Sequence, residues 1–309
     1  MLQKPAVLGA AACALIGAAA SACSLTDLSY LQQGVGSGGV TSTSSVTITT
    51  TSSSTSSSSA TFTATTTNTV GGTGGVGGTG GSTSTGTGGA VVAVDVTDGL
   101  YLRYKFDEAG GMIAADDSGN NLDGTLGGSA GWGKGKFGGA LSLGGGTDLV
   151  SLPAGVVSTL TSVTVSFWIE WGGGIWSRAF DFGAGETSWM YVAGDTPDLG
   201  NGVKGLRFAM RRGAIISEFG TGTILPLGRW VHVAVTLEKP HAAIYVDGAR
   251  VAESNLMALT PADLGVTPQN WIGASQYGDA NLVGLVDEFR IYNRALTDAE
   301  VASLAALGR

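Results

Sequence analysis

Alternating apolar and polar residues mark the C-terminal two thirds of the chain. Three segments, 100–106, 163–169 and 231–237, place Leu, Val, Ile or an aromatic residue at every second position. Residues two apart in an extended chain share a face, so each segment predicts a strand with one buried face. Residues 243–252 predict a hairpin, because Asp247-Gly248 at their centre suits the positive φ angles of a type I′ turn.

Shorter apolar runs predict further strands, and glycine-rich turns separate most of them. These runs are 140–143, 148–152, 175–182, 189–193, 206–211, 214–219, 271–274 and 283–292. Roughly ten to thirteen short antiparallel strands favour an all-β sandwich of two sheets. One short C-terminal helix is predicted after Thr297, because Thr297 and Glu300 have the spacing of a capping box and Gly308 follows as a stop.

The first 22 residues have the pattern of a secretory signal peptide. Lys4 precedes an uncharged, alanine-rich stretch that is short for a membrane span. Its end, Ala20-Ser21-Ala22-Cys23, resembles the lipobox of bacterial lipoproteins, although Ala20 stands where that motif prefers Leu. The resemblance implies acylation of Cys23 and, with Ser24 rather than Asp next, a lipid anchor in the outer membrane. The alternative is ordinary secretion with Cys23 as a free thiol.

Residues 23–90 are predicted to form a disordered tether. Positions 41–70 hold 23 Ser or Thr, and positions 71–90 hold 11 Gly. Such a segment has little apolar surface to bury, and burial is what offsets the entropy of ordering a chain. The folded domain is therefore expected to occupy residues 91–309.

Composition excludes several classes of function. The 309 residues carry 16 Lys and Arg against 24 Asp and Glu, a formal net charge of −8. Nucleic acid is therefore not expected as a partner, because phosphate neutralisation needs a basic surface. Only two Cys and two His occur, and both Cys lie within the first 23 residues. The domain thus contains no disulfide and no Cys-based zinc site.

A series of short motifs resembles the LamG-like jelly-roll domains of the concanavalin A-like lectin/glucanase superfamily. In chain order they are Tyr104–Glu108, Asp116–Asn120, Gly135–Leu141, Val165–Ile169, Trp230–Ala234, Ile244–Gly248 and Val286–Leu296. The resemblance implies a jelly-roll sandwich that serves as a binding or structural module on an extracellular protein. The partners it implies are carbohydrates or proteins.

The acidic residues suit a cation better than hydrolysis. A retaining glycosidase needs two carboxylates about 5–5.5 Å apart. The acidic pairs of this chain, such as Asp287-Glu288, are adjacent and would point to opposite faces of a strand. In jelly-roll relatives the first and last strands lie close together and often bind a structural Ca²⁺. We therefore expect Asp107, Asp116 and Asp287 to bind Ca²⁺ with help from carbonyl groups at 119–121; the alternative for Asp116 is a turn-stabilising role.

Three tryptophans are candidates for stacking against a sugar. Trp171, Trp176 and Trp189 lie in or beside the middle strands and have Gly, Arg or Ser neighbours. The alternative for each is a place in the core. The sequence thus predicts a surface-displayed, non-enzymatic module that binds a glycan or a protein at the cell envelope. The alternatives are an adhesion module without a small ligand and a cryptic glycoside hydrolase.

Overall fold

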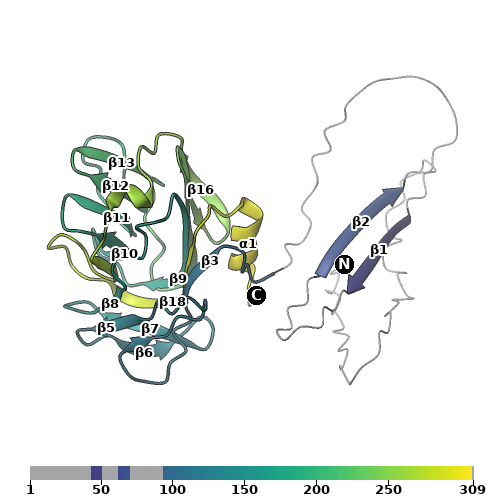
Figure 1. The fold of residues 1–309 in the computed structure, drawn as a ribbon, viewed down its shortest axis with the longest axis horizontal. Coiled ribbons are helices and arrows are strands. Elements are labelled where there is room, and N and C mark those ends of the chain that lie inside the picture. Colours follow the sequence, from purple (N-terminus) through teal and green to yellow (C-terminus); the bar gives the residue numbers. More distant parts are fainter. Residues whose placement is uncertain (1–42, 51–61, 70–92, 308–309) are drawn as a thin grey trace, which may run out of the picture. The chain divides into compact units, whose positions relative to one another are not determined.

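Sixteen strands pair antiparallel into two sheets in the C-terminal part of the chain (Figure 1). The computed structural model describes residues 43–50, 62–69 and 93–307. The first sheet has the order β13-β12-β11-β10-β17-β8-β5-β4, and the second has the order β16-β15-β14-β9-β18-β7-β6 with β3 also paired to β18. This confirms the predicted all-β, two-sheet sandwich.

Thirteen of these strands overlap the runs predicted from the sequence, and three short strands do not. The first sheet comprises β4 (Ile113–Ala114), β5 (Gly124–Gly127), β8 (Leu149–Leu152), β10 (Arg178–Gly183), β11 (Ser188–Ala193), β12 (Arg207–Arg212), β13 (Ile215–Gly220) and β17 (Gln269–Ile272). The second comprises β3 (Leu100–Tyr104), β6 (Gly131–Lys134), β7 (Gly139–Gly144), β9 (Ser162–Trp171), β14 (Trp230–Glu238), β15 (His241–Val246), β16 (Ala249–Ser254) and β18 (Val283–Tyr292). A short 3₁₀ helix, η2 (Pro261–Leu264), interrupts the connection between β16 and β17.

The core lies between the two sheets and is built from every second residue of each strand. The ring of Phe167 on β9 stacks on Phe289 of β18, with 5.7 Å between centroids. Across the sandwich the ring of Phe180 on β10 meets Phe167 edge-on at 6.3 Å. These three rings join the two sheets, and removing them from water is a main driving force for packing the sheets together.

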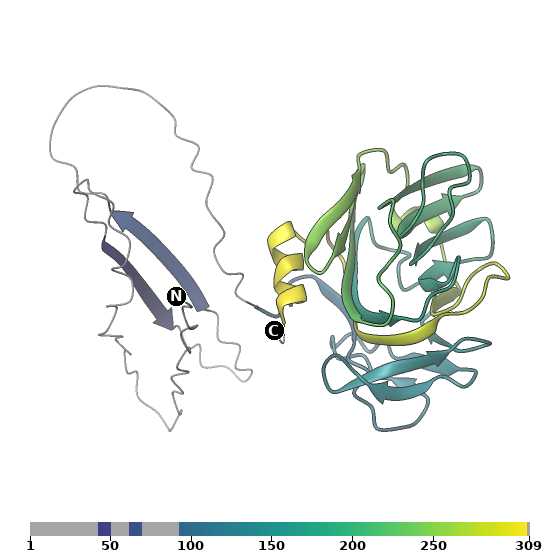
Figure 2. The same ribbon diagram turned by 180° about the vertical axis from the view of Figure 1, so that it is seen from behind.

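The C-terminal helix, α1 (Asp298–Ala306), covers part of the outer face of the second sheet (Figure 2). It begins as predicted, because the Thr297 side chain accepts a hydrogen bond from the Glu300 backbone N–H and the Glu300 carboxylate accepts one from Thr297 N–H. Val301 and Leu304 pack against outward-facing residues of that sheet, including Tyr245. Within the described residues, no helix is long and apolar enough to cross a membrane.

Two further strands lie in the segment for which composition predicts a tether. Strands β1 (Thr43–Thr50) and β2 (Phe62–Thr69) pair antiparallel, with Thr43 opposite Thr69. Threonine favours extended backbone, which accounts for strands in this Thr-rich sequence. These strands belong to a unit separate from the sandwich, and most of residues 23–90, with the signal peptide and Cys23, lies outside the described residues. The tether stays a prediction.

Candidate functional site

A pocket opens on the outer face of the first sheet, above β10, β11, β12 and β13. Alternation places Trp189 and Tyr191 of β11 on this face, because their neighbours Met190 and Val192 point into the core. Pairing sets Trp189 opposite Arg211 of β12. Side chains opposite one another across two strands lie about 5 Å apart at Cβ, so the rings and the guanidinium group share one patch.

A bulge in β10 adds a charged group to the same face. The register shifts between Arg178 and Phe180, which leaves Ala179 as the extra residue. Arg178 is therefore opposite Ala193, and Asp181 is opposite Tyr191. A bulge redirects a side chain in this way, and here it brings Arg178 and Asp181, three residues apart, into a buried ion pair.

We call this cavity the outer-face pocket. Its volume is about 310 Å³, at the lower end of the range usual for ligand-binding clefts. Its lining combines four aromatic rings (Trp176, Trp189, Tyr191, Tyr277), three arginines (Arg178, Arg207, Arg211), two acids (Glu218, Asp279) and two aliphatic residues (Leu199, Ile216). Large apolar surfaces with a few convergent polar groups are typical of small-molecule sites.

The aromatic rings form a packed cluster rather than isolated surface residues. The rings of Trp189 and Tyr191 lie 5.0 Å apart, and Tyr277 meets Trp189 nearly edge-on at 6.3 Å. Trp189 Nε1 donates hydrogen bonds to the Glu186 carbonyl group and to the Tyr277 hydroxyl group. Trp189 and Tyr191 are buried, whereas Trp176 and Tyr277 are half-buried and pack against them. The exposed aromatic surface therefore comes from Trp176 and Tyr277.

Two of the arginines are fixed by carboxylates and rings. The Arg178 guanidinium carbon lies 3.9 Å from the centroid of the Tyr191 ring, and this group also donates a hydrogen bond to Asp279 Oδ2 at 3.1 Å. The Arg207 guanidinium carbon lies 5.1 Å from the Trp176 ring, and its Nη1 donates to Glu218 Oε2 at 3.0 Å. These cation–π contacts and ion pairs hold the rings in place.

Burial shifts the acid–base properties of groups beneath the outer-face pocket. It raises the pKa of Asp181 to about 7, although the Arg178 charge and a hydrogen bond from Gln276 N–H act in the opposite direction. It also raises the pKa of Tyr191 to about 12. Asp181 is fully buried, so it supports Arg178 and is not accessible to a ligand.

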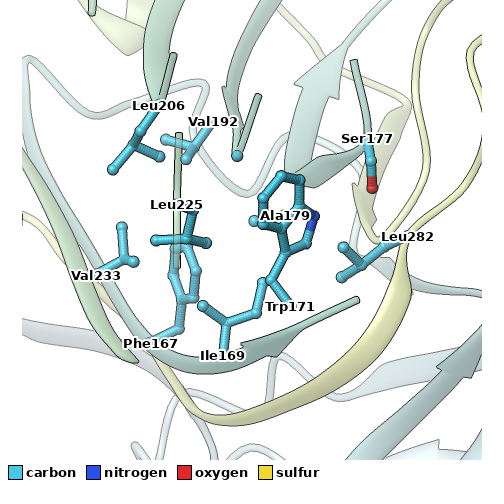
Figure 3. Close-up of a pocket in the computed structure, with 11 residues that line it drawn as sticks. Phe167, Ile169, Trp171, Ser177, Ala179, Val192, Leu206, Leu225, Val233 and Leu282 are labelled. Atoms are coloured by element: carbon cyan, nitrogen blue, oxygen red, sulfur yellow. The ribbon is translucent and has the colours of Figure 1, made fainter. Parts of the chain in front are cut away.

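Trp171 is not part of this surface. It is only 2% exposed and lies in the core between the sheets, beside Ile169 and Leu282 (Figure 3). The prediction of a surface role for Trp171 is thus replaced by a core role. The reason is the alternation itself, because Trp171 lies at the same phase of β9 as Phe167 and Ile169.

Trp176 and Trp189 do lie together in the outer-face pocket. Trp176 reaches it from the loop before β10 with a positive φ of 62°, and Trp189 reaches it from β11. Sequence analysis did not identify Tyr191 and Tyr277 as their neighbours. Tyr191 could have been assigned to the same face, because it lies two residues from Trp189 on one strand. Tyr277 comes from an irregular loop far along the chain, and no local sequence pattern places it near Trp189.

The three acids of the predicted calcium site do not come together. Both oxygens of Asp116 are occupied by its own loop and by β3: Oδ1 accepts from Arg103 N–H and Ser118 N–H, and Oδ2 accepts from Leu122 N–H and the Ser118 hydroxyl group. Asp116 therefore stabilises the turn, which was the alternative to a calcium ligand. No group of three or more His, Cys, Asp or Glu residues in the described part of the chain is arranged to hold a metal ion.

Asp107 and Asp287 lie close to one turn. Asp287 Oδ2 accepts a hydrogen bond from Phe137 N–H at 2.8 Å, and Asp107 Oδ1 accepts one from Gly139 N–H at 2.7 Å. Asp287 is 0% exposed, and its Oδ1 has no hydrogen-bond partner. Burial raises the pKa of Asp287 to about 7, and the nearby charges of Glu288 and Asp107 add to the rise. A buried carboxylate oxygen without a partner fits a cation ligand, so calcium stays a prediction that now involves two acids.

Residues 144–302 match the sequence profile of the concanavalin A-like lectin/glucanases superfamily, which is more than half of the chain. The chain belongs to this superfamily. No curated protein matches it at a significant level. Among solved structures, domain 4 of AbnA, an extracellular GH43 arabinanase from Geobacillus stearothermophilus determined in complex with arabinotriose, is similar with a TM-score of 0.57. The identity is 24%, and the match covers 67% of this chain and 98% of that domain.

A second solved structure with a similar fold is the binding domain of botulinum neurotoxin serotype C1. The TM-score is 0.50 at 13% identity, and the match covers 69% of this chain. The chain spans about half the length of that toxin domain, since 52% of it is covered. At these identities the two structures show a likeness of fold alone.

Proposed function

We propose that the sandwich is a non-enzymatic binding module that holds a carbohydrate in the outer-face pocket. The observation that carries this proposal is the lining of the pocket, where aromatic rings, guanidinium groups and carboxylates converge on about 310 Å³. The arabinanase domain, which shares the fold and was determined with arabinotriose, supports a carbohydrate over other small ligands.

The chemistry of the lining suits a sugar ring. The half-buried rings of Trp176 and Tyr277 offer apolar faces for the C–H side of a sugar. The carboxylates of Glu218 and Asp279 accept hydrogen bonds from hydroxyl groups, and the arginines donate to ring and hydroxyl oxygens. Because ion pairs and ring contacts already hold these side chains, little ordering entropy is lost on binding.

The ion pairs of the two pocket acids favour binding without turnover. Glycoside hydrolysis needs one protonated carboxylic acid and one free carboxylate beside the scissile bond. In the outer-face pocket Glu218 is paired with Arg207 and Asp279 with Arg178. Each carboxylate is therefore held by a guanidinium group and serves to position an arginine of the pocket.

Calorimetric titration of the purified chain with an oligosaccharide panel that includes arabino-oligosaccharides tests this proposal. Saturable binding is expected, and Trp176→Ala should weaken it about tenfold or more, as one lost aromatic contact is worth roughly 1–3 kcal/mol. The matched control is Trp132→Ala, which alters a half-buried tryptophan of β6 on the other sheet. Equal effects of the two variants would reject the outer-face pocket as the binding site. The absence of any saccharide binding would reject the carbohydrate proposal and leave a protein ligand or an adhesion role.

The N-terminal pattern adds a proposal about placement. Acylation of Cys23 would anchor the protein to the cell envelope, in the outer membrane, and residues 23–90 would act as a tether. An anchor and a flexible tether raise the local concentration of a binding module at a surface. For the calcium ion, Asp107 and Asp287 would supply the carboxylates and would hold the turn at residues 137–139 to the last strand.

A further inference from the structure

The arginines of the outer-face pocket differ in how their charges are balanced. Arg178 pairs with Asp181 and Asp279, and Arg207 pairs with Glu218. Arg211 has no carboxylate within ion-pair distance in residues 93–307. It is half-buried, so part of its hydration is already lost without a counter-charge in return.

The hydrogen bonds of Arg211 leave one edge of its guanidinium group available. Nε donates to the Gly213 carbonyl group at 2.8 Å, which fixes the orientation of the plane. Nη1 makes a long contact of 3.3 Å to the Tyr277 hydroxyl group, and Nη2 has no partner in the described residues. The Nη1–Nη2 edge matches the two oxygens of a carboxylate, and such forked pairs are stronger than neutral hydrogen bonds.

The position of Arg211 relates this free edge to the aromatic cluster. Arg211 lies directly opposite Trp189 across β11 and β12, and both line the outer-face pocket with Tyr277. A sugar ring held against the aromatic residues would therefore place a ring substituent beside the guanidinium group. A carboxylate on that ring would gain a charge-assisted contact that a neutral hydroxymethyl group cannot make.

We propose that the outer-face pocket takes an acidic saccharide and that Arg211 binds its carboxylate, which rests on the proposed function of the pocket. The recognition is short-range, because the chain as a whole carries a charge of −8 and its overall field does not attract anions. Specificity comes from a single fixed guanidinium edge. The ligand class is a saccharide with a uronate or sialate type of carboxylate.

The test compares saccharides that differ only in this charge. The purified full chain is titrated with oligogalacturonides and with their methyl esters, and with sialyllactose and lactose. We expect at least one acidic member to bind about tenfold to a hundredfold more tightly than its neutral counterpart, the range of one charge-assisted hydrogen-bonded pair. Binding of that member should weaken as salt is raised.

Variants assign the effect to one residue. Arg211→Gln should remove the preference for the acidic form, so that the acidic saccharide binds no more tightly than its neutral counterpart. The matched control is Arg212→Gln, which alters the exposed neighbouring arginine of β12 and should keep the preference. Thermal melts of both variants report whether the fold is retained.

The outcomes separate this inference from the proposal on which it rests. Equal affinity of the unaltered chain for acidic and neutral forms overturns the acidic ligand and leaves the carbohydrate-binding function standing. If the Arg211→Gln variant still prefers the acidic saccharide, another group of the protein binds the saccharide carboxylate, and the role of Arg211 is overturned. No binding of any saccharide overturns both.

Discussion

Replacing Asp287 with Asn is expected to stabilise the protein at alkaline pH. The Asp287 side chain is fully buried at the junction of β18 with the 137–139 turn, and burial raises its pKa from 3.8 to about 7. The protonated form is therefore the one that suits the fold. Its contribution to stability is fully present below the unfolded pKa and is lost as pH rises through 7.

The size of the effect follows from the two pKa values. Each pH unit between them is worth about 1.4 kcal/mol. Compared with a side chain that stays neutral, the raised pKa of Asp287 therefore lowers the unfolding free energy by about 4 kcal/mol at pH 8, where the carboxyl is ionised in both states, and by about 2 kcal/mol at pH 5, where it is ionised only in the unfolded chain. Asn is neutral throughout, and its carbonyl oxygen can still accept the hydrogen bond from Phe137 N–H. The gain in unfolding free energy from Asp287→Asn should thus fall by about 2–3 kcal/mol between pH 8 and pH 5.

Urea unfolding in EDTA at pH 5, 6.5 and 8 measures this difference. Asp117→Asn is the control, because Asp117 is a half-exposed acid whose ion pair with Lys105 should be worth less than about 1 kcal/mol at every pH. If Asp287→Asn destabilises the protein at pH 8 in EDTA, or if its effect does not change with pH, the assignment of a buried, unfavourable carboxylate is refuted.

The same pair of proteins tests the proposed calcium ion. A cation between Asp107 and Asp287 would make ionised Asp287 favourable, since a ligand of the folded state adds stability by mass action. Excess Ca²⁺ should then raise the midpoint of the unaltered chain more at pH 8 than at pH 5, and Asp287→Asn should lose that rise. Equal midpoints in EDTA and in Ca²⁺ at pH 8 would argue against the ion.

Three further predictions concern the core, the helix and the anchor. Trp171→Ala should lower the unfolding free energy by about 3–5 kcal/mol, while the protein that remains folded binds saccharide with normal affinity. A loss of saccharide affinity at unchanged stability would mean that Trp171 contacts the ligand. Thr297→Ala should cost about 1 kcal/mol by removing the cap of α1, and a cost near zero in chemical unfolding would mean that the cap is unimportant. Cys23→Ala should shift the protein from the membrane to the soluble fraction of cells, and an unchanged membrane fraction would contradict the lipid anchor.

The fold was largely predictable because period-two alternation is strong in the long strands. β9 places a row of branched and aromatic residues on the core side and β14 places a row of branched aliphatic residues there, and both strands are predicted from that row alone. β4, β5 and β6 were not predicted. They are two to four residues long, and glycine occupies both ends of β5 and alternate positions of β6, so no apolar row is long enough to be recognised. Their pairing depends on neighbouring strands supplied by the rest of the sandwich.

The site was predictable only in part, because it draws on residues from both strands and loops. Trp176 and Trp189 stood out as tryptophans with small or polar neighbours, and the structure brings them together. The same criterion misplaced Trp171, where the phase of the strand outweighs the character of its neighbours. Tyr277 and the bulge that turns Arg178 outward depend on tertiary pairing, which no local pattern of the sequence encodes.

The most direct test of a carbohydrate site on the outer face is an NMR titration that follows the tryptophan indole N–H signals while an intact saccharide from the binding screen is added. The account predicts saturable shifts of the Trp176 and Trp189 signals. The signals of Trp171, in the core, and of Trp132, on the other sheet, should remain still, and the spectrum of the saccharide should show no new reducing ends. Shifts confined to Trp132 or to other parts of the domain, or the steady appearance of cleaved saccharide, would contradict it.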